Sequence, residues 1–260
     1  MNAATLPLFR GTSESNLNAS VVLRESIPES LVWEMYQLYA ANYLDTSAEL
    51  FRSDLSEKTH VLMLRNDVGQ LCGFSTIQLY SSTVDTTAVR VVYSGDTIIA
   101  PAYWGSQALA FEWIRFAGET YRLNPDVPLY WLLIVKGHRT YRFLPAFARR
   151  YVPHHADPGT DIELRTRAVL AAEKFGESFD AQTGLVRFSS CLGRLNPSLA
   201  DIPARHQRLP DVAHFLALNP GYRNGDELVC LCRLTPENLR PRAARVFCEP
   251  GQYPGLSSSD

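Results

Sequence analysis

The chain has 260 residues, of which 46% are hydrophobic and 20% are charged, and its formal net charge is -2. This length allows one large domain or two small ones, with a core that needs no disulfides. The slightly acidic balance argues against a general nucleic-acid or membrane-surface binder, and no apolar run reaches the roughly 18 residues of a transmembrane helix.

The first part of the chain is predicted to contain an arm, two helices and four strands. Residues 1–19 are polar and mixed, which predicts a loose arm. Helical spacing of apolar residues predicts the helices, and β-branched or alternating runs predict the strands. The elements expected here are a strand over Val21–Arg24, helices over Pro28–Tyr43 and Ala48–Lys58, and strands over His60–Arg65, Leu71–Tyr80 and Val89–Ala100.

The stretch Val89–Tyr121 is predicted to be a strand that leads into a helix beginning at Gly105–Ser106. A helix N-terminus presents unpaired backbone N–H groups and the positive end of the helix dipole, and this combination favours a bound phosphate. We therefore expect a ligand site at this junction.

The rest of the chain begins with a buried strand and continues less regularly. Leu129–Val135 is a nearly continuous apolar run, as expected of a strand covered on both faces. Without a Gly/Ser linker, residues 20–248 are expected to form one domain with a helical insertion at 162–176, followed by a disordered tail at 249–260. The further elements expected are helices over Thr140–Tyr151, Ile162–Phe175, Asp211–Leu218 and Pro236–Val246, and strands over Gly184–Ser189 and Glu227–Leu234.

This order of elements resembles that of the GNAT superfamily of acyl-coenzyme A N-acyltransferases. The family's pyrophosphate-binding loop has an Arg/Gln-x-x-Gly-x-Gly/Ala pattern, and the matching segment here is residues 104–109, WGSQAL. Gly105 fits the pattern, while Trp104, Gln107 and Leu109 depart from it. The resemblance implies an α/β fold with a mixed, mostly antiparallel central sheet flanked by helices, here with an elaborated C-terminal third.

The resemblance also implies a co-substrate, acetyl-CoA or a longer acyl-CoA, that lies between the strands Val89–Ala100 and Leu129–Val135. The family often has a tyrosine on the next helix that protonates the departing thiolate. In this chain Phe147 falls at that position, and Tyr141 is the nearest phenol. The expected coenzyme contacts are Ile98, Ile99, Ala100, Trp104, Gly105, Ser106, Gln107 and Ala108.

Three side chains are candidates for catalysis, each with a structural alternative. Asp96 interrupts an apolar strand and would serve as a general base, because burial raises a carboxyl pKa, or it accepts hydrogen bonds at a bulge beside Gly95. Tyr141 is either the general acid or a half-buried aromatic. His138 is either a base near neutral pH or a solvated loop histidine.

Three functions are compatible with these observations. The first is an acyl-CoA-dependent N-acyltransferase, in which a small-molecule amine attacks the thioester directly. The second is a non-catalytic GNAT-like module that binds an acyl thioester, a lipid or a protein partner. The third is transfer from an acyl carrier protein, because a basic helix carries Arg139, Arg142, Arg149 and Arg150.

The cysteines indicate the redox compartment of the protein, and the histidines bear on whether it binds a metal. The five cysteines are scattered and show no CxxC spacing, which favours reduced thiols in the cytoplasm. The pair His154–His155 has no third ligand at a sensible spacing, so we expect no metal. The sequence does not predict the oligomeric state.

Overall fold

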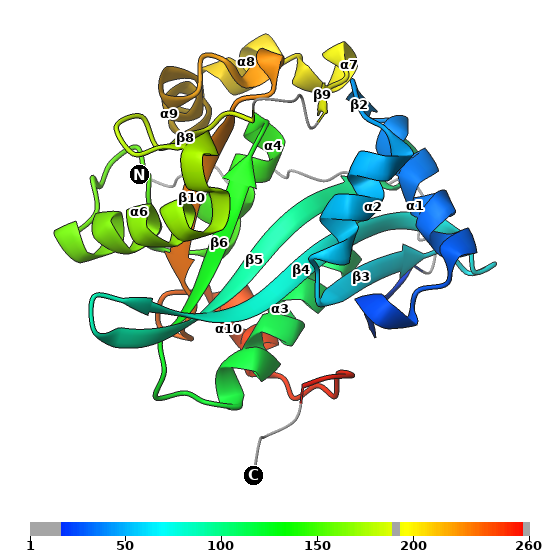
Figure 1. The fold of residues 1–260 in the computed structure, drawn as a ribbon, viewed down its shortest axis with the longest axis horizontal. Helices are drawn as coiled ribbons and strands as arrows, with labels where there is room; N and C mark the ends of the chain where they lie inside the picture. Colours follow the sequence, from blue (N-terminus) through cyan, green and yellow to red (C-terminus); the bar gives the residue numbers. More distant parts are fainter. Residues whose placement is uncertain (1–16, 189–192, 257–260) are drawn as a thin grey trace.

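A computed structural model of the protein describes residues 17–188 and 193–256. Within these residues one large sheet forms the centre of the molecule, and helices cover both of its faces (Figure 1). Across the sheet the strands are β1 (Asn18–Leu23), β3 (His60–Arg65), β4 (Leu71–Val84), β5 (Thr87–Ile99), β6 (Leu129–Val135), β10 (Glu227–Arg233), β8 (Leu185–Val186) and β7 (Phe179–Asp180). The short strands β2 (Tyr43–Leu44) and β9 (Arg194–Leu195) pair separately.

Every pairing in the large sheet is antiparallel except that of β5 with β6, which is parallel. The predicted fold class, a mixed and mostly antiparallel sheet flanked by helices, is therefore confirmed. The helices are α1 (Glu29–Ala40), α2 (Ala48–Ser56), α3 (Ala108–Arg122), α4 (His138–Tyr141), α5 (Phe143–Phe147), α6 (Asp161–Phe175), α7 (Pro197–Ala200), α8 (Ala204–Gln207), α9 (Pro210–Leu218) and α10 (Pro241–Cys248). Single 3-10 turns lie at Arg24–Ser26, Pro101–Tyr103, Gly176–Ser178 and Tyr222–Asn224.

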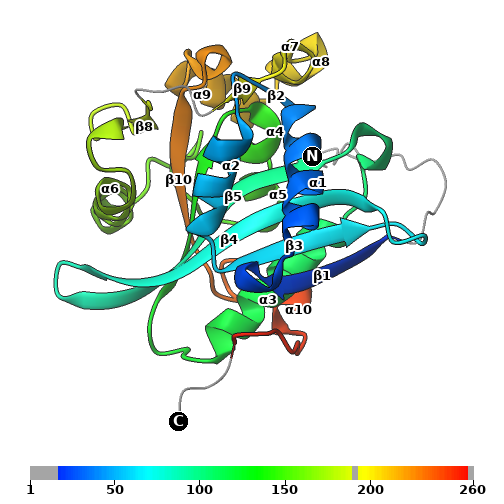
Figure 2. The ribbon, with the colours of Figure 1, turned by 45° about the vertical axis from the view of Figure 1, so that its right-hand side comes forward.

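Alternation along the strands sends side chains to two different cores. In β3, Val61 and Met63 pack under α1 and α2, while Leu62 and Leu64 pack against α3 on the opposite face. The second core also holds α4, α5, α9 and α10. Helix α6 covers the far end of the first face, over β6 and β10 (Figure 2). The first face is therefore covered by α1 and α2 at one end and by α6 at the other.

The strands β5 and β6 separate part-way along their length. Their parallel pairing runs only from Arg90 with Leu129 to Ser94 with Leu133. Beyond that point β6 stays paired with β10, and β5 stays paired with β4. The resulting V between the two strands opens toward the end of the sheet that carries α4 (Figure 1).

A bulge in β5 coincides with this separation. Thr97 pairs with Ser75 of β4, and Ser94 pairs with Ile77, so β5 has one more residue than β4 over this interval. The extra residue falls at Gly95–Asp96 and changes the direction of the side chains that follow. The bulge beside Gly95, one of the two sequence-based expectations for Asp96, is present.

Several predicted boundaries are wrong. Helix α3 begins at Ala108 rather than at Gly105–Ser106, because Trp104 and Gly105 form a turn in which Gly105 has a φ of 103°, and residues 106–107 have no regular structure. The helix predicted over Thr140–Tyr151 consists of the two short helices α4 and α5, and the chain is extended again at Ala148. The predicted C-terminal helix begins at Pro241, five residues later than expected.

The predicted termini are also corrected where the structure describes them. Strand β1 already begins at Asn18, inside the predicted arm. In the predicted tail, the Tyr253 ring packs against Phe116 at 5.2 Å, and the Pro254 carbonyl lies 2.9 Å from His60 Nε2. Residues 1–16 of the arm, residue 189 of a predicted strand and residues 257–260 of the tail lie outside the described residues. Among the described helices, none has both the length and the apolar character that crossing a membrane requires.

Candidate functional site

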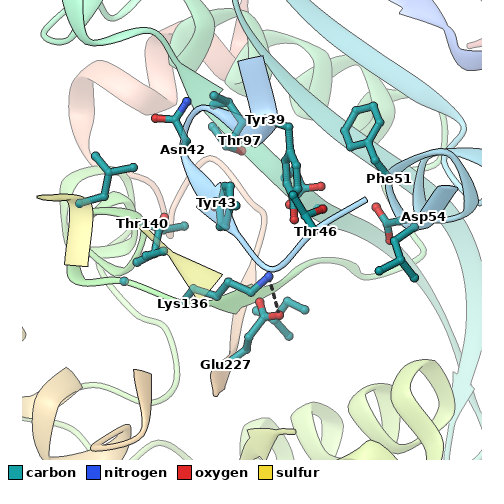
Figure 3. A pocket seen from close by; sticks show the side chains of 18 of the residues that line it. Tyr39, Asn42, Tyr43, Thr46, Phe51, Asp54, Thr97, Lys136, Thr140 and Glu227 are labelled. Atoms are coloured by element: carbon teal, nitrogen blue, oxygen red, sulfur yellow. Dashed lines mark ion pairs between the residues drawn. The ribbon is translucent and has the colours of Figure 1, made fainter. Parts of the chain in front are cut away.

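A cavity of about 390 Å³ lies on the face covered by α1, α2 and α6, over the separation of β5 and β6 (Figure 3). This volume is near the lower end of the range of roughly 300–1,000 Å³ found for small-molecule sites. Helices α2 and α6 form opposite walls, and β5, β6 and the start of β10 form the floor. The charged and aromatic lining residues are Tyr39, Tyr43, Phe51, Asp54, Glu57, Tyr93, Asp96, Trp104, Lys136, His138, Arg139, Lys174, Phe175, Phe188 and Glu227.

Asp96 reaches this cavity because of the bulge. Ile98, two residues later, packs in the core under α1 and α2, and Asp96 faces the same side. Burial, followed by the negative charge of Asp54, raises the pKa of Asp96 to about 7, although Lys136 and Lys58 oppose the shift. A carboxyl group with this pKa is partly ionised at neutral pH and can accept a proton there.

A buried ion pair lies beside Asp96. Lys136, just after β6, places its Nζ atom 3.2 Å from Oε1 of Glu227, the first residue of β10 (Figure 3). Both side chains are almost fully buried. Burial alone would lower the pKa of Lys136, but the negative charges of Glu227 and Asp96 raise it above its ordinary value. Lys136 is therefore held as a cation in the V between the strands.

Two further lysine–carboxylate pairs flank Tyr93 of β5. Lys58 Nζ lies 2.6 Å from Asp54 Oδ1 and 5.5 Å from the centre of the Tyr93 ring. Lys174 of α6 lies 5.0 Å from the same ring centre and 3.0 Å from Glu57 Oε2. Cations over aromatic faces are attracted by the ring quadrupole, so these lysines are held over Tyr93.

Aromatic side chains from α1 and its following loop form a third wall. The rings of Tyr39 and Tyr43 stack with their centroids 4.5 Å apart, and Tyr39 also contacts Phe51 of α2 at 5.2 Å. The Tyr43 ring lies 5.2 Å from Lys136 Nζ. Burial raises the pKa of both tyrosines above the ordinary value, so both phenols are neutral at physiological pH.

His138 lines the same cavity, but its surroundings disfavour the charged form. Burial, and then the positive charge of Arg139, lower its pKa to about 4. Its Nε2 atom has no hydrogen-bond partner among the described residues. His138 is therefore neutral near pH 7, and it is buried rather than solvated as the structural alternative expected.

Tyr141 does not reach the cavity. Its ring is fully buried on the opposite face of the sheet, against Phe215 and Tyr151, and its hydroxyl donates to the Pro153 carbonyl at 2.7 Å. Burial raises its pKa above the ordinary value. Helix α4 turns this side chain into the second core, away from the cavity, and this position agrees with the structural alternative for Tyr141, a buried aromatic, rather than with a general acid at the cavity.

The expected coenzyme contacts divide into two groups. Ile98, Ile99 and Trp104 line the cavity, whereas Ala100 does not and instead donates its N–H to the Cys72 carbonyl at 2.8 Å. The indole N–H of Trp104 donates to the Ile99 carbonyl at 2.7 Å. Trp104 therefore bonds to the end of the β5 edge that a donor in the V would face.

The turn before α3 is only partly available to a diphosphate. Among residues 105–108, the Ser106 amide donates to the Tyr103 carbonyl, and the Ala108 amide donates to the Ser106 hydroxyl. The Gln107 side chain makes no capping hydrogen bond, and its Oε1 atom is buried without a partner among the described residues. This turn therefore offers fewer free amides to a diphosphate than the sequence resemblance implies.

The predicted basic helix does not form one surface. Arg142 pairs with Asp211, and Arg150 pairs with Glu163 at 2.6 Å. Arg149 donates to the Leu239 carbonyl, and the Arg139 guanidinium lies 5.0 Å from the centre of the Trp104 ring. These four arginines have separate partners within the chain, because the region is two short helices and an extended segment rather than one helix.

Sequence reasoning missed Lys136, Glu227, Lys58 and Lys174 as site residues. The alternation of β10 gave a usable signal, since Glu227 lies on the same face as Val229 and Leu231, which pack under α6. No local signal connects these residues with Asp96, because they come from separate parts of the chain. In the part of the chain that the structure describes, no group of three or more His, Cys, Asp and Glu side chains is placed to hold a metal ion.

No protein-family model and no curated protein matches the sequence. Solved structures similar to part of the chain include a probable N-acyltransferase from Enterococcus faecalis, with 16% identity, coverage of 52% of this chain and 33% of that chain, and a TM-score of 0.38. A GNAT-family N-acetyltransferase from Escherichia coli in complex with CoA has 19% identity, coverage of 53% and 72%, and a TM-score of 0.35.

An acyl-CoA N-acyltransferase from Pseudomonas aeruginosa has 19% identity, coverage of 51% of this chain and 88% of that chain, and a TM-score of 0.37. This chain spans about a third of the length of the Enterococcus faecalis protein.

Proposed function

We propose that the protein is a divergent GNAT-type N-acyltransferase that moves an acyl group from a CoA thioester to an amine. The observation that carries this proposal is the position of Asp96, whose carboxyl group lies at the separation of β5 and β6 and has a pKa near 7. A base in that place is adjacent to both the strand edge that would hold a donor and the cavity that would hold an acceptor.

The reaction proceeds by direct attack of the amine on the thioester. The amine nitrogen forms a bond to the carbonyl carbon, the carbon–sulfur bond breaks, and Asp96 accepts the proton that the nitrogen loses. The thiolate takes up a proton from water as it leaves and Asp96 returns its proton to water, so the products are an amide and a free thiol and Asp96 is a carboxylate again. Among the described residues, no strand pairs with the β5 edge beyond Ser94 on the β6 side, so in this proposal a backbone N–H of that edge polarises the carbonyl.

Donor binding requires the end of the V to open. The Trp104 indole bonds to the Ile99 carbonyl, and the Arg139 guanidinium lies over the indole. An acyl-pantetheine arm that pairs with β5 has to replace the Trp104 hydrogen bond with one of its own. Trp104 is about half exposed, so this exchange exposes less apolar surface than the displacement of a fully buried indole would.

Calorimetric titration tests the donor half of the proposal. Acetyl-CoA, longer acyl-CoAs, free CoA and an acyl carrier protein loaded with the same acyl groups are titrated into the protein. We expect acyl-CoA to bind and release thiol when a mixed panel of amines is added. Thiol release from the loaded carrier alone would replace CoA with the carrier as the donor, and no binding of any thioester would overturn the proposal.

The departures of residues 104–109 from the family pattern, and the position of Tyr141 away from the cavity, favour a second candidate, a module that binds an acyl thioester without turning it over. The two candidates differ in one measurement, since a binding module gives a calorimetric signal with acyl-CoA and no amine-dependent thiol. Asp96→Asn separates them further, because it should abolish thiol release by an enzyme and leave donor binding intact.

A further inference from the structure

Three lysine–carboxylate pairs line or border the cavity, and they differ in how accessible the carboxylate is. In the Lys136–Glu227 pair the two side chains are 11% and 6% exposed. In the Lys58–Asp54 pair they are 0% and 45% exposed. In the Lys174–Glu57 pair they are 13% and 58% exposed. Glu57 is therefore the carboxylate that solvent reaches most easily.

The Lys174–Glu57 pair is also the one whose carboxylate can be exchanged. It joins α6 to the residue that follows α2, across the cavity, and an ion pair with such an exposed partner contributes little to stability. Lys58 cannot exchange in this way, because its side chain is fully buried and its Nζ atom is also held by the Asp54 carbonyl at 3.0 Å. Lys174 can therefore accept an incoming carboxylate in place of that of Glu57.

Tyr93 lies close to both residues, to Lys174 in space and to Asp96 along the strand. The Lys174 Nζ atom lies 5.0 Å from the centre of the Tyr93 ring, and Asp96 follows Tyr93 three residues later on the same strand. All three side chains line one cavity. A cation that can hold an anionic group, on α6, and a carboxyl group that can receive a proton from an amine, on β5, thus line the same cavity.

We propose that the acceptor carries both an amine and a carboxylate, so that an amino acid binds with its carboxylate on Lys174 and its amine toward Asp96. This inference rests on the proposed function for the role of the amine, but not for the binding of the carboxylate. The ligand group replaces the glutamate carboxylate of the protein itself, which is why a carboxylate is the matching chemistry.

The experiment measures binding by calorimetry in the absence of any donor. Free α-amino acids are compared with their C-terminal amides, which keep the amine and lose the carboxylate. At least one amino acid should bind the wild-type protein tenfold or more tighter than its amide, since a charge-assisted hydrogen bond of about 1.5–3 kcal/mol corresponds to that ratio. Equal affinity of acid and amide for every pair tested would overturn the proposal.

Variants of Lys174 and of Glu57 should change the affinity for a free carboxylate in opposite directions. Lys174→Met should remove the preference for the acid over the amide, while Glu57→Gln should strengthen binding of the acid several-fold because it frees Lys174. Arg165→Met is the matched control, since it removes one positive charge from the same helix at a residue that pairs with Asp85. An equal loss with Arg165→Met, or weaker binding with Glu57→Gln, would contradict the proposal.

Failure of this inference and failure of the proposed function give different results. Thiol release with simple amines only, and no preference for acids, would leave the acyltransferase in place and remove the amino-acid acceptor. Tight binding of amino acids without thiol release from any donor would retain the carboxylate site and overturn the acyltransferase.

Discussion

Strand β5 has two halves, residues 87–94 and residues 95–99, and their environments differ. From Thr87 to Ser94 the strand pairs with β4, and from Arg90 onward also with β6. The Ser94 hydroxyl accepts hydrogen bonds from the indoles of Trp113 and Trp131 at 3.1 and 3.0 Å. From Gly95 to Ile99 the strand pairs with β4 alone and faces the cavity.

The difference shows how one strand can serve both stability and function. From Arg90 to Ser94 the first half is paired on both edges, and from Val91 to Ser94 it is buried on both faces, so its side chains contribute mainly to packing. The second half keeps one edge unpaired, which costs pairing partners but provides backbone groups and a carboxyl group to a ligand. Substitutions in the two halves should therefore affect different measurable properties.

The largest expected effect is that of Asp96→Asn in the second half. The amide cannot accept the amine proton, so kcat/KM for thiol release should fall by about 10²–10⁴. The unfolding midpoint should change little, because asparagine has nearly the same shape. An active Asp96→Asn protein would exclude Asp96 as the base.

Leu132→Ala removes a side chain of β6, the strand that pairs with the first half of β5. Leu132 lies opposite Tyr93 on β6 and is fully buried. Removing its side chain should lower the free energy of unfolding by about 2–5 kcal/mol, as measured by urea denaturation. The folded fraction should retain its acyl-donor affinity at low temperature, and a selective loss of that affinity would contradict the division of β5 into two halves.

Gly95→Ala acts at the boundary between the halves. A Cβ atom at this position would lie 2.5 Å from Thr76 Oγ1 and 2.9 Å from Lys58 Cε, so both side chains must move. We expect a stability loss of about 1–3 kcal/mol, together with a lower kcat because Lys58 and Asp96 are neighbours. Gly69→Ala is a contrasting variant, since Gly69 has a φ of 80° and no atom lies within 4 Å of the added Cβ, so its cost is backbone strain without a steric clash.

The pH dependence of kcat/KM should be set by Asp96, which lies in the second half of β5. The pKa of Asp96 is raised to about 7, and only the unprotonated carboxylate can accept the amine proton. Below that pH, kcat/KM should therefore fall by up to about tenfold for each unit of pH, and above it this limb should level off. A rate that stays constant from pH 5 to pH 8 would be inconsistent with Asp96 as the base.

The smallest effect is expected for Tyr141→Phe, on the face away from the cavity. This change removes the hydrogen bond to the Pro153 carbonyl and should cost about 1 kcal/mol of stability. The kcat for thiol release from the folded enzyme should be unchanged. A fall in kcat without a change in thermal stability would support Tyr141 as the general acid.

The sequence by itself determined the order of strands and helices and the presence of an ionisable group in β5. Apolar periodicity located the main strands to within a few residues, because burial of alternate residues is a local property. Asp96 stood out because a carboxylate in an apolar strand is costly unless it has a role. The run Leu129–Val135 was correctly identified as a strand buried on both faces.

Only the tertiary structure decided which side chains meet. A one-residue bulge turns Asp96 toward α2, and Lys136, Glu227 and Lys174 arrive from β6, β10 and α6. Tyr141, close to His138 in sequence, is turned into the opposite core. These outcomes depend on register and on contacts between distant segments, and a pattern of period 2 or 3.6 carries no information about either.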